Sequence, residues 1–365
     1  MVRIHDPAIR RLFFLSLVAL LLAVGSAPGD SAETNQRRVS QLADGVYAIE
    51  HKNLNDGNTS GNTTVIIGER EVFVVDSCYR PSSAREDIAQ IRQWTNKPVG
   101  YLLNTHFHND HNNGNKTYLD AFPSLAIIAE EETKKDMDLI QPGNVERQPG
   151  ELAALIATFK QGKDQSGRAL SKDETKQVQE LLPGLEQAEA ESKTLVYQSP
   201  TLTFADKLDI DIGNREVQVK YLGRGNTAGD SIVYLPKEKI IVAGDLLVHP
   251  IPYTYDGYPS EWVQVLHKMG QLDATTIVPG HGPILHDKAY LNLVADLMQS
   301  VVDQVRARIR QLGFPGGHTL DEIKGSVDLT KFSQQFAGND KDLQAQFGDM
   351  ADHLLKITFS EAAQR

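Results

Sequence analysis

Residues 104–115 read Asn-Thr-His-Phe-His-Asn-Asp-His-Asn-Asn-Gly-Asn. Within six positions this stretch holds three histidines and an aspartate, which are His106, His108, Asp110 and His111. Imidazole and carboxylate are the ligands that zinc takes where no thiolate is offered. The apolar residues 99–103 predict a strand before the cluster, and the asparagines and glycine after it favour a tight turn into a helix. The pattern therefore predicts a metal site at a strand end, where a rigid sheet aims the side chains at one point.

Short β-branched runs bounded by turn residues predict further strands on both sides of this stretch. They cover residues 46–50, 63–67, 72–75, 125–129, 207–212, 217–221, 232–235, 239–242 and 276–278. Helical spacing of apolar residues predicts helices over 82–95, 260–272 and 287–312, followed by two shorter helical pieces. Three of the strands end close to an acid or a histidine, namely Asp76, Asp245 and His281. Such side chains at strand ends extend the candidate site beyond the histidine cluster.

Residues 130–198 differ in composition from the rest of the chain, since they are rich in Glu, Lys, Gln and Ala. Ser171 and Glu174 form a capping-box pattern for a helix to Leu182. The Pro-Gly pair at 183–184 predicts a break or kink before a further helix to about residue 193. The segment is either a solvated helical hairpin or a lid over the site.

The acids, the histidine cluster, a glycine-rich turn at 223–230 and His281 occur in an order that resembles the metallo-β-lactamase superfamily. The resemblance covers about 42–285, apart from the helical segment. It implies an α/β fold, a four-layer αββα sandwich with two sheets face to face and helices outside. The domain would span 33–286 with an insertion at about 130–198, and residues 287–365 would form a helical extension packed on it.

The resemblance also implies one or two zinc ions and assigns their ligands. The first zinc would be held by His106 and His108, the second by Asp110, His111 and His281, and Asp245 would bridge both. Asp76 would act as a structural acid that orients the ligands without binding the metal.

One position departs from the superfamily pattern. The turn at 223–227 reads Gly-Arg-Gly-Asn-Thr, so Asn226 stands where a third histidine for the first zinc is usual. Asn226 either coordinates through its carbonyl oxygen, leaves the first zinc loosely held, or leaves only the second site loaded. His249 and His286 are nearby substitutes, although a histidine at such a position is more often a surface or core residue.

The activity that the resemblance implies is hydrolysis by a metal-bound hydroxide, with Asp110 as both ligand and orienter of the attacking water. His249, Tyr253 and Tyr255 belong to a loop that either forms an apolar wall for substrate or is simply packed. A cyclic amide or ester fits such a wall, which favours β-lactamase-like or lactonase-like activity on a small molecule. The alternatives are a non-catalytic metal- or ligand-binding protein and, less favoured, a di-iron redox protein.

The N-terminus has the pattern of a secretory signal peptide. Arg3, Arg10 and Arg11 precede an apolar run at 12–24, and small residues follow at 25–32. The run is short for a membrane span, so we expect cleavage, export to the periplasm or medium, and no stable membrane insertion afterwards.

Composition narrows the remaining possibilities. The net charge of −11 offers no basic stripe for nucleic acid. The chain has a single cysteine, Cys78, which excludes an internal disulfide and which we expect to be a small buried residue. Nothing in the sequence decides the oligomeric state.

Overall fold

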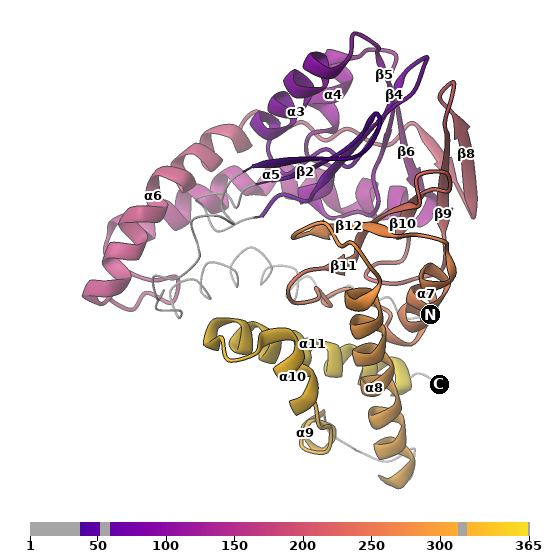
Figure 1. Cartoon of the computed structure of the whole chain (residues 1–365). Helices are drawn as coiled ribbons and strands as arrows, with labels where there is room; N and C mark the ends of the chain where they lie inside the picture. The colour runs from indigo at the N-terminus through magenta and orange to yellow at the C-terminus, as the bar shows by residue number, and fades with distance from the viewer. Residues whose placement is uncertain (1–36, 52–58, 313–319, 364–365) are drawn as a thin grey trace.

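The computed structural model describes residues 37–51, 59–312 and 320–363 (Figure 1). The predicted signal peptide, residues 1–32, lies outside the described residues, so its prediction stands untested. In the described part, no helix combines the length and the apolar character that crossing a bilayer requires.

Two mixed sheets form the centre of the molecule. The first has the order β1-β2-β3-β4-β5-β6-β7, antiparallel up to β4 and parallel beyond it. Its strands are β1 (Arg38–Ala43), β2 (Val46–Glu50), β3 (Thr63–Ile67), β4 (Val72–Val75), β5 (Val99–Leu103), β6 (Ala126–Glu130) and β7 (Leu202–Phe204). The sequence did not predict β1 or β7, because β1 is a largely exposed, polar edge strand and β7 has three residues.

The second sheet has the order β12-β11-β10-β9-β8. Its strands are β8 (Lys207–Asp211), β9 (Glu216–Tyr221), β10 (Ser231–Leu235), β11 (Ile240–Val248) and β12 (Thr276–His281). Only β11 and β12 pair in parallel. Both strands run further than the predicted segments 239–242 and 276–278, and the added residues include Asp245 and His281.

Alternating side chains place each sheet between two apolar layers. Phe73 and Val75 of β4 enter the core between the sheets, whereas Val72 and Val74 pack toward the outer helices. Val233 of β10 reaches the same central core from the opposite sheet. This period of two explains why the central strands read as continuous apolar runs with no polar face.

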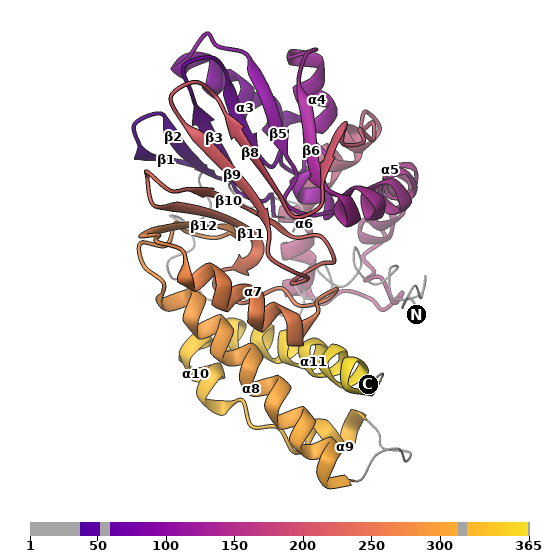
Figure 2. The same cartoon turned by 90° about the vertical axis from the view of Figure 1, so that its right-hand side faces the viewer.

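Helices cover the outer faces of both sheets (Figures 1 and 2). The first sheet carries α3 (Pro81–Trp94) and α4 (Asn115–Ala121), packed through an apolar cluster that includes Ile88 and Tyr118. The second carries α7 (Pro259–Gln271) and α8 (Ala289–Leu312), packed around Trp262 and Met298. The layers are helix, sheet, sheet, helix, which confirms the four-layer αββα sandwich.

The insertion is a hairpin of two long helices, α5 (Glu131–Lys160) and α6 (Lys172–Ser192), and α6 projects away from the sheets in Figure 1. The Ser171–Glu174 capping box is present. Of the break or kink predicted at 183–184, the break is wrong, because α6 continues through Pro183. Leu185 and Ala188 beyond that proline are buried against α5, and this packing outweighs the hydrogen bond that proline removes.

The C-terminal residues form α9 (Leu320–Lys324), α10 (Thr330–Ala337) and α11 (Lys341–Ala363) after α8. The prediction of two short pieces is wrong for α11, a helix of 23 residues. Its Leu354 is fully buried in the cluster that also holds the apolar faces of α7 and α8. The sequence Thr319-Leu-Asp-Glu322 also predicts a capping box, and its first residue lies outside the described residues.

Candidate metal centre

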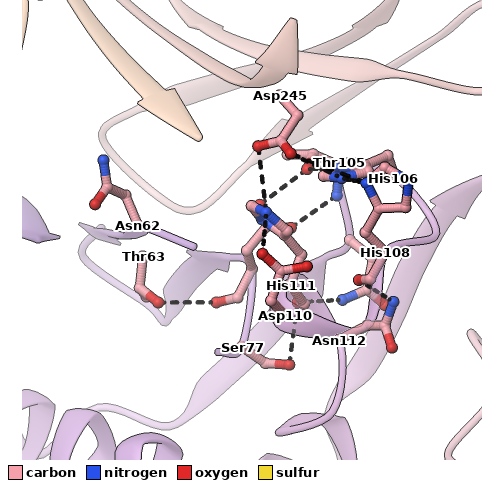
Figure 3. A network of polar contacts seen from close by, with 12 residues as sticks. Asn62, Thr63, Ser77, Thr105, His106, His108, Asp110, His111, Asn112 and Asp245 are labelled. Carbon is pink, nitrogen blue, oxygen red and sulfur yellow. Dashed lines mark hydrogen bonds and ion pairs between the residues drawn. The ribbon is translucent and has the colours of Figure 1, made fainter. Parts of the chain in front are cut away.

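Five of the predicted ligands, His106, His108, Asp110, His111 and Asp245, meet where strands of both sheets end (Figure 3), and His281 contacts two of them. β5 delivers the stretch that contains His106 and His108, and the short helix η1 (Asn109–His111) turns Asp110 and His111 back toward it. Asp245 and His281 come from β11 and β12 of the other sheet. Tertiary structure thus joins residues that are about 170 positions apart, as between His111 and His281.

Asp245 presents its two carboxylate oxygens to two different sets of histidines. Oδ1 lies 3.3 Å from His111 Nε2 and 3.6 Å from His281 Nε2. Oδ2 lies 3.5 Å from His106 Nε2 and 3.9 Å from His108 Nδ1. A carboxylate placed in this way can contact two adjacent ions, one through each oxygen.

Asp110, His111 and His281 form one compact set of donor atoms. His281 Nε2 lies 3.0 Å from Asp110 Oδ2 and 3.2 Å from His111 Nε2. His111 Nε2 lies 3.5 Å from the same Asp110 oxygen. The His111 side chain is fully buried, whereas that of Asp110 keeps 21% of its surface exposed. Asp110 therefore lies on the side of the set that solvent reaches.

His106 and His108 form the other set. His106 Nε2 lies 2.9 Å from His108 Nδ1, so these two nitrogens converge. The second nitrogen of His108 lies 3.2 Å from Asp256 Oδ2. A carboxylate at that position orients the imidazole and raises its basicity as a ligand.

Asn226, the position that departs from the pattern, is fully buried. Among the described residues, neither its Oδ1 nor its Nδ2 has a hydrogen-bond partner. The turn that carries it is held by Asp230, whose Oδ2 accepts hydrogen bonds from the amides of Thr227 (2.7 Å) and Gly225 (3.2 Å). A buried amide without partners is costly, and a cation bound to its carbonyl oxygen would remove the part of that cost that belongs to the oxygen.

Asp76 holds the ring of His111 and the backbone at Thr105 in place. Its carboxylate accepts from the Thr105 amide and hydroxyl, each at 2.8 Å, and lies 2.8 Å from His111 Nδ1. The residue adopts φ 60°, a left-handed conformation that side chains other than glycine rarely take. These contacts leave His111 Nε2 directed at the other ligands, which agrees with the predicted role of Asp76.

Asn62 hydrogen-bonds the first sheet to the second beside the centre, and it was not predicted from the sequence. The Asn62 backbone N–H donates to Gly280 O at 2.6 Å, and its side-chain Nδ2 donates to Pro279 O at 3.0 Å. Gly280 is required there, because a Cβ would lie 1.9 Å from Asp245 Oδ1. Asn62 lies in a loop without periodicity, so no sequence signal marked it.

The charges of the site suit a cation. Burial acts to raise the pKa of Asp110 and of Asp245, but the neighbouring histidines, His111 first, hold both well below the usual range. Burial, with His111 next to it, lowers the pKa of His106 to about 4. Burial opposes the charged form of His111, yet Asp245 and Asp110 raise its pKa well above the usual value. Both carboxylates are therefore ionised at neutral pH, as metal binding requires.

The predicted substrate wall is only partly beside the centre. The Tyr253 ring lies 5.4 Å from that of His108, at a steep angle. Tyr255 packs instead against His353 of α11, with ring centroids 3.9 Å apart. His249 packs against Tyr290 at 4.8 Å, although its amide donates to His281 O.

His286, the other histidine considered as a substitute ligand, is exposed, and no contact joins it to the centre within the described chain. Of the two substitutes, only His249 thus lies next to a ligand, and its ring faces Tyr290.

The helical insertion touches the histidine stretch at one point. The Gln141 side chain in α5 donates to Phe107 O at 2.5 Å, between the two histidines of the first set. Nearer the start of the same helix, Thr133 Oγ1 donates to Gly229 O at 2.7 Å in the turn after Asn226. The first half of α5 therefore supports two ligand-bearing segments, whereas α6 lies away from them.

Comparison with known proteins agrees with this geometry. A sequence model of the metallo-beta-lactamase superfamily matches residues 56–281. The linear primary-alkylsulfatase of Pseudomonas sp. (strain ATCC 19151) is 27% identical over 303 residues, which are 78% of this chain and 53% of that protein. The chain thus spans about half the length of this relative. The metallo-beta-lactamase type 2 of Elizabethkingia meningoseptica is 22% identical, over 72% of this chain and 86% of that protein.

Solved structures agree at the level of the fold. The metallo-beta-lactamase from Pontibacter korlensis superposes with a TM-score of 0.50 and 19% identity, over 72% of this chain and 99% of that one. The structure of VMB-1 gives 0.51 and 20%, over 73% and 98%. Identities this low support the shared fold alone.

Proposed function

We propose, because this chain belongs to the metallo-beta-lactamase superfamily, that it is an exported zinc-dependent hydrolase of small molecules. The observation that carries the proposal is the position of Asp245, whose two oxygens face the two sets of histidines separately. Four imidazoles and a second ionised carboxylate, Asp110, packed around the Asp245 carboxylate are typical of a metal centre and are rare in a purely structural cluster.

The residues present fit zinc in their chemistry. His106 and His108 would hold one ion with Asn226, and Asp110, His111 and His281 would hold the other, with Asp245 between them. The unpartnered Asn226 amide supports the choice of its oxygen as a ligand over a loosely held or absent first zinc. Zinc bound there would polarise the bond to be cleaved and bring the pKa of water to about 7.

The protein's own groups supply orientation and proton transfer. Asp110 is the partly exposed carboxylate of the centre, so it is the group that can accept a proton from water on the substrate side. Asp76 holds His111 in place, and Asp256 does the same for His108. Tyr253 offers an aromatic surface beside His108 for the apolar part of a substrate.

Two substrate classes follow from different observations. The apolar wall at Tyr253 favours a cyclic amide or ester, so β-lactamase-like or lactonase-like activity leads. The alkylsulfatase relative, similar over 78% of this chain, supports a sulfate ester of an alkyl chain as the second candidate. A member of the fold that binds metal or ligand without turnover is the non-enzymatic alternative.

The test counts metals in the purified mature protein and measures turnover on a chromogenic β-lactam, an aromatic lactone and an alkyl sulfate. We expect up to two zinc ions at the centre around Asp245 and turnover on one of the three. Asp110→Asn should reduce kcat by at least about a hundredfold, the usual worth of a general base. Asp209→Asn, which changes an exposed acid on β8, is the matched control and should leave kcat unaltered. Bound zinc without turnover on any ester, amide or sulfate would support the non-catalytic alternative.

A further inference from the structure

A second cluster of metal-ligating side chains lies apart from the ligands around Asp245, at His51, Cys78 and Asp87. His51 follows β2, Cys78 follows β4, and Asp87 belongs to α3. His51 Nε2 lies 3.2 Å from Cys78 Sγ and 3.2 Å from Asp87 Oδ2. Cys78 Sγ lies 3.1 Å from the same Asp87 oxygen. One nitrogen, one sulfur and one oxygen thus form a nearly equilateral triangle.

The triangle has the dimensions of a metal site. Bonds of about 2.0–2.3 Å to a tetrahedral zinc place neighbouring ligand atoms roughly 3.3–3.7 Å apart. At the candidate metal centre, the donor atoms of Asp110, His111 and His281 lie 3.0–3.5 Å apart. The 3.1–3.2 Å distances of the second triangle fall within this range. An ion could therefore enter the second triangle with an expansion of a few tenths of an ångström.

The surroundings exclude water and hold the thiol in place. Cys78 is fully buried, the Asp87 side chain is 0% exposed and that of His51 4%. Cys78 adopts φ 73°, a conformation that glycine takes without cost and a cysteine does not. That backbone conformation directs Sγ at His51 and Asp87.

Charge and an unpartnered hydroxyl also bear on a cation at this position. A thiolate and a carboxylate together carry two negative charges, of which the Arg37 guanidinium offsets one, so one net negative charge is left to attract a cation. Arg37 Nη2 donates to Asp87 Oδ1 at 2.8 Å, so Oδ2 is the oxygen left for the triangle. The Tyr118 hydroxyl is buried and has no hydrogen-bond partner in the described chain. Burial first, then the neighbouring Asp87 and Cys78, raise the pKa of Tyr118, so this hydroxyl keeps its proton.

We propose that His51, Cys78 and Asp87 form a separate structural site for a borderline divalent cation, of which zinc is the natural example. The ion would replace the thiol proton, which leaves to solvent, and would bond to sulfur, nitrogen and oxygen. Because the site is closed to water, it ties the ends of β2 and β4 to α3 and takes no part in turnover. Cys78 is two residues from Asp76, so occupancy would also steady the orientation of His111.

Cobalt substitution tests the proposal directly, since Cys78 is the single cysteine of the chain. The full chain is unfolded, refolded with Co²⁺ and examined for the near-ultraviolet thiolate-to-cobalt charge-transfer band. The ligands of the centre around Asp245 are nitrogen and oxygen, so this band can come only from Cys78. We expect the band in the wild type and about one more bound cobalt than in Cys78→Ser. His281→Ala should keep the band while it loses cobalt from the other centre.

His51→Ala provides a second variant if Cys78→Ser does not refold, and it should lose the band. His267→Ala, which changes an exposed histidine on α7, is its matched control and should retain the band. A wild type that shows no band after refolding with cobalt would overturn the proposal, and Cys78 would then be a hydrogen-bonded core thiol. Equal cobalt content in the wild type and Cys78→Ser would overturn it as well.

Discussion

In the proposed zinc centre, Asn226 is the residue on which the loading of the first metal position would depend. Its side chain is fully buried and unpartnered among the described residues, whereas the turn around it is well hydrogen-bonded through Asp230. The backbone therefore holds the amide rigidly, and the amide has no protein partner to satisfy it. An amide oxygen is a weaker zinc ligand than imidazole, so the first ion should be the more easily lost of the two.

Replacing Asn226 by histidine should tighten that position. An imidazole restores the nitrogen ligand that the superfamily pattern has at this place, and we expect the weaker zinc to bind on the order of tenfold more tightly. Competition with a chromophoric chelator measures the change. Asn214→His, in the exposed turn between β8 and β9, is the control and should leave zinc affinity as it is. Unaltered affinity and stoichiometry in Asn226→His would mean that Asn226 is not a ligand.

At the scale of elements, α11 supports the loop of residues 249–258 that borders the centre. Thr254 Oγ1 donates to Met350 O at 3.2 Å, and Tyr255 packs on His353. Within that loop the ring centroids of Tyr253 and Tyr255 lie 4.7 Å apart, and Tyr253 in turn packs on His108. The contact between α11 and Tyr255 therefore stabilises the position of Tyr253. The C-terminal helix is remote in sequence from the candidate metal ligands, yet it packs on the loop that lies next to them.

His353→Ala should therefore weaken substrate binding without removing metal. The aromatic pair is worth about 0.5–1.5 kcal/mol, so KM should rise roughly two- to tenfold at constant zinc content. Gln346→Ala, at an exposed position of the same helix, controls for changes in helix stability. An unchanged KM would show that the loop keeps its position without α11.

The insertion has a small core of its own between α5 and α6, in which Leu152 is fully buried. Leu152→Ala should cost about 2–5 kcal/mol, and because the core is separate, the loss should appear as local opening of the hairpin. Hydrogen exchange should rise over residues 150–192 while zinc content stays constant. Leu139→Ala, on the same helix but 55% exposed, should change neither quantity. Loss of zinc in Leu152→Ala would indicate that the hairpin and the centre unfold together.

At the scale of the whole molecule, the candidate centre joins the two sheets. His106, Asp110 and His111 follow a strand of the first sheet, whereas Asp245 and His281 come from the second. In Figure 3 the Asp245 side chain faces the histidines across the junction between the two differently coloured halves of the ribbon. Ions bound there would crosslink halves that otherwise meet through the apolar core between the sheets.

Removal of metal should thus lower the stability of the entire chain. A ligand at a thousand times its Kd adds about 4 kcal/mol, which for a protein of this size raises Tm by about 5–6 °C. We expect a chelator to remove that increment, zinc to restore it, and His281→Ala to start without much of it. His267→Ala should respond like the wild type. A Tm that a chelator does not change, in protein shown to contain zinc, would rule out this crosslinking role.

Most strands could be predicted because the central strands are apolar on both faces and carry their signal locally, whereas the four-layer arrangement was implied by the resemblance to the superfamily. The edge strand β1 is polar, and β7 is too short for a periodic signal. Pro183 was misread because a break is a local preference, whereas the burial of Leu185 against α5 is a tertiary effect. The length of α11 was underestimated although its apolar face covers α7 and α8.

The sequence alone predicted a metal site, because the residue types at 106–111 and their spacing are covalent properties of the chain. Only the tertiary structure decided which candidate ligands group together. The packing of the two sheets places Asp245 so that its two oxygens face separate sets of histidines. The same holds for His51, Cys78 and Asp87, which come together across 36 residues of sequence with no motif to mark them. Long-range contacts of this kind depend on where strands end in space, and no local pattern encodes that.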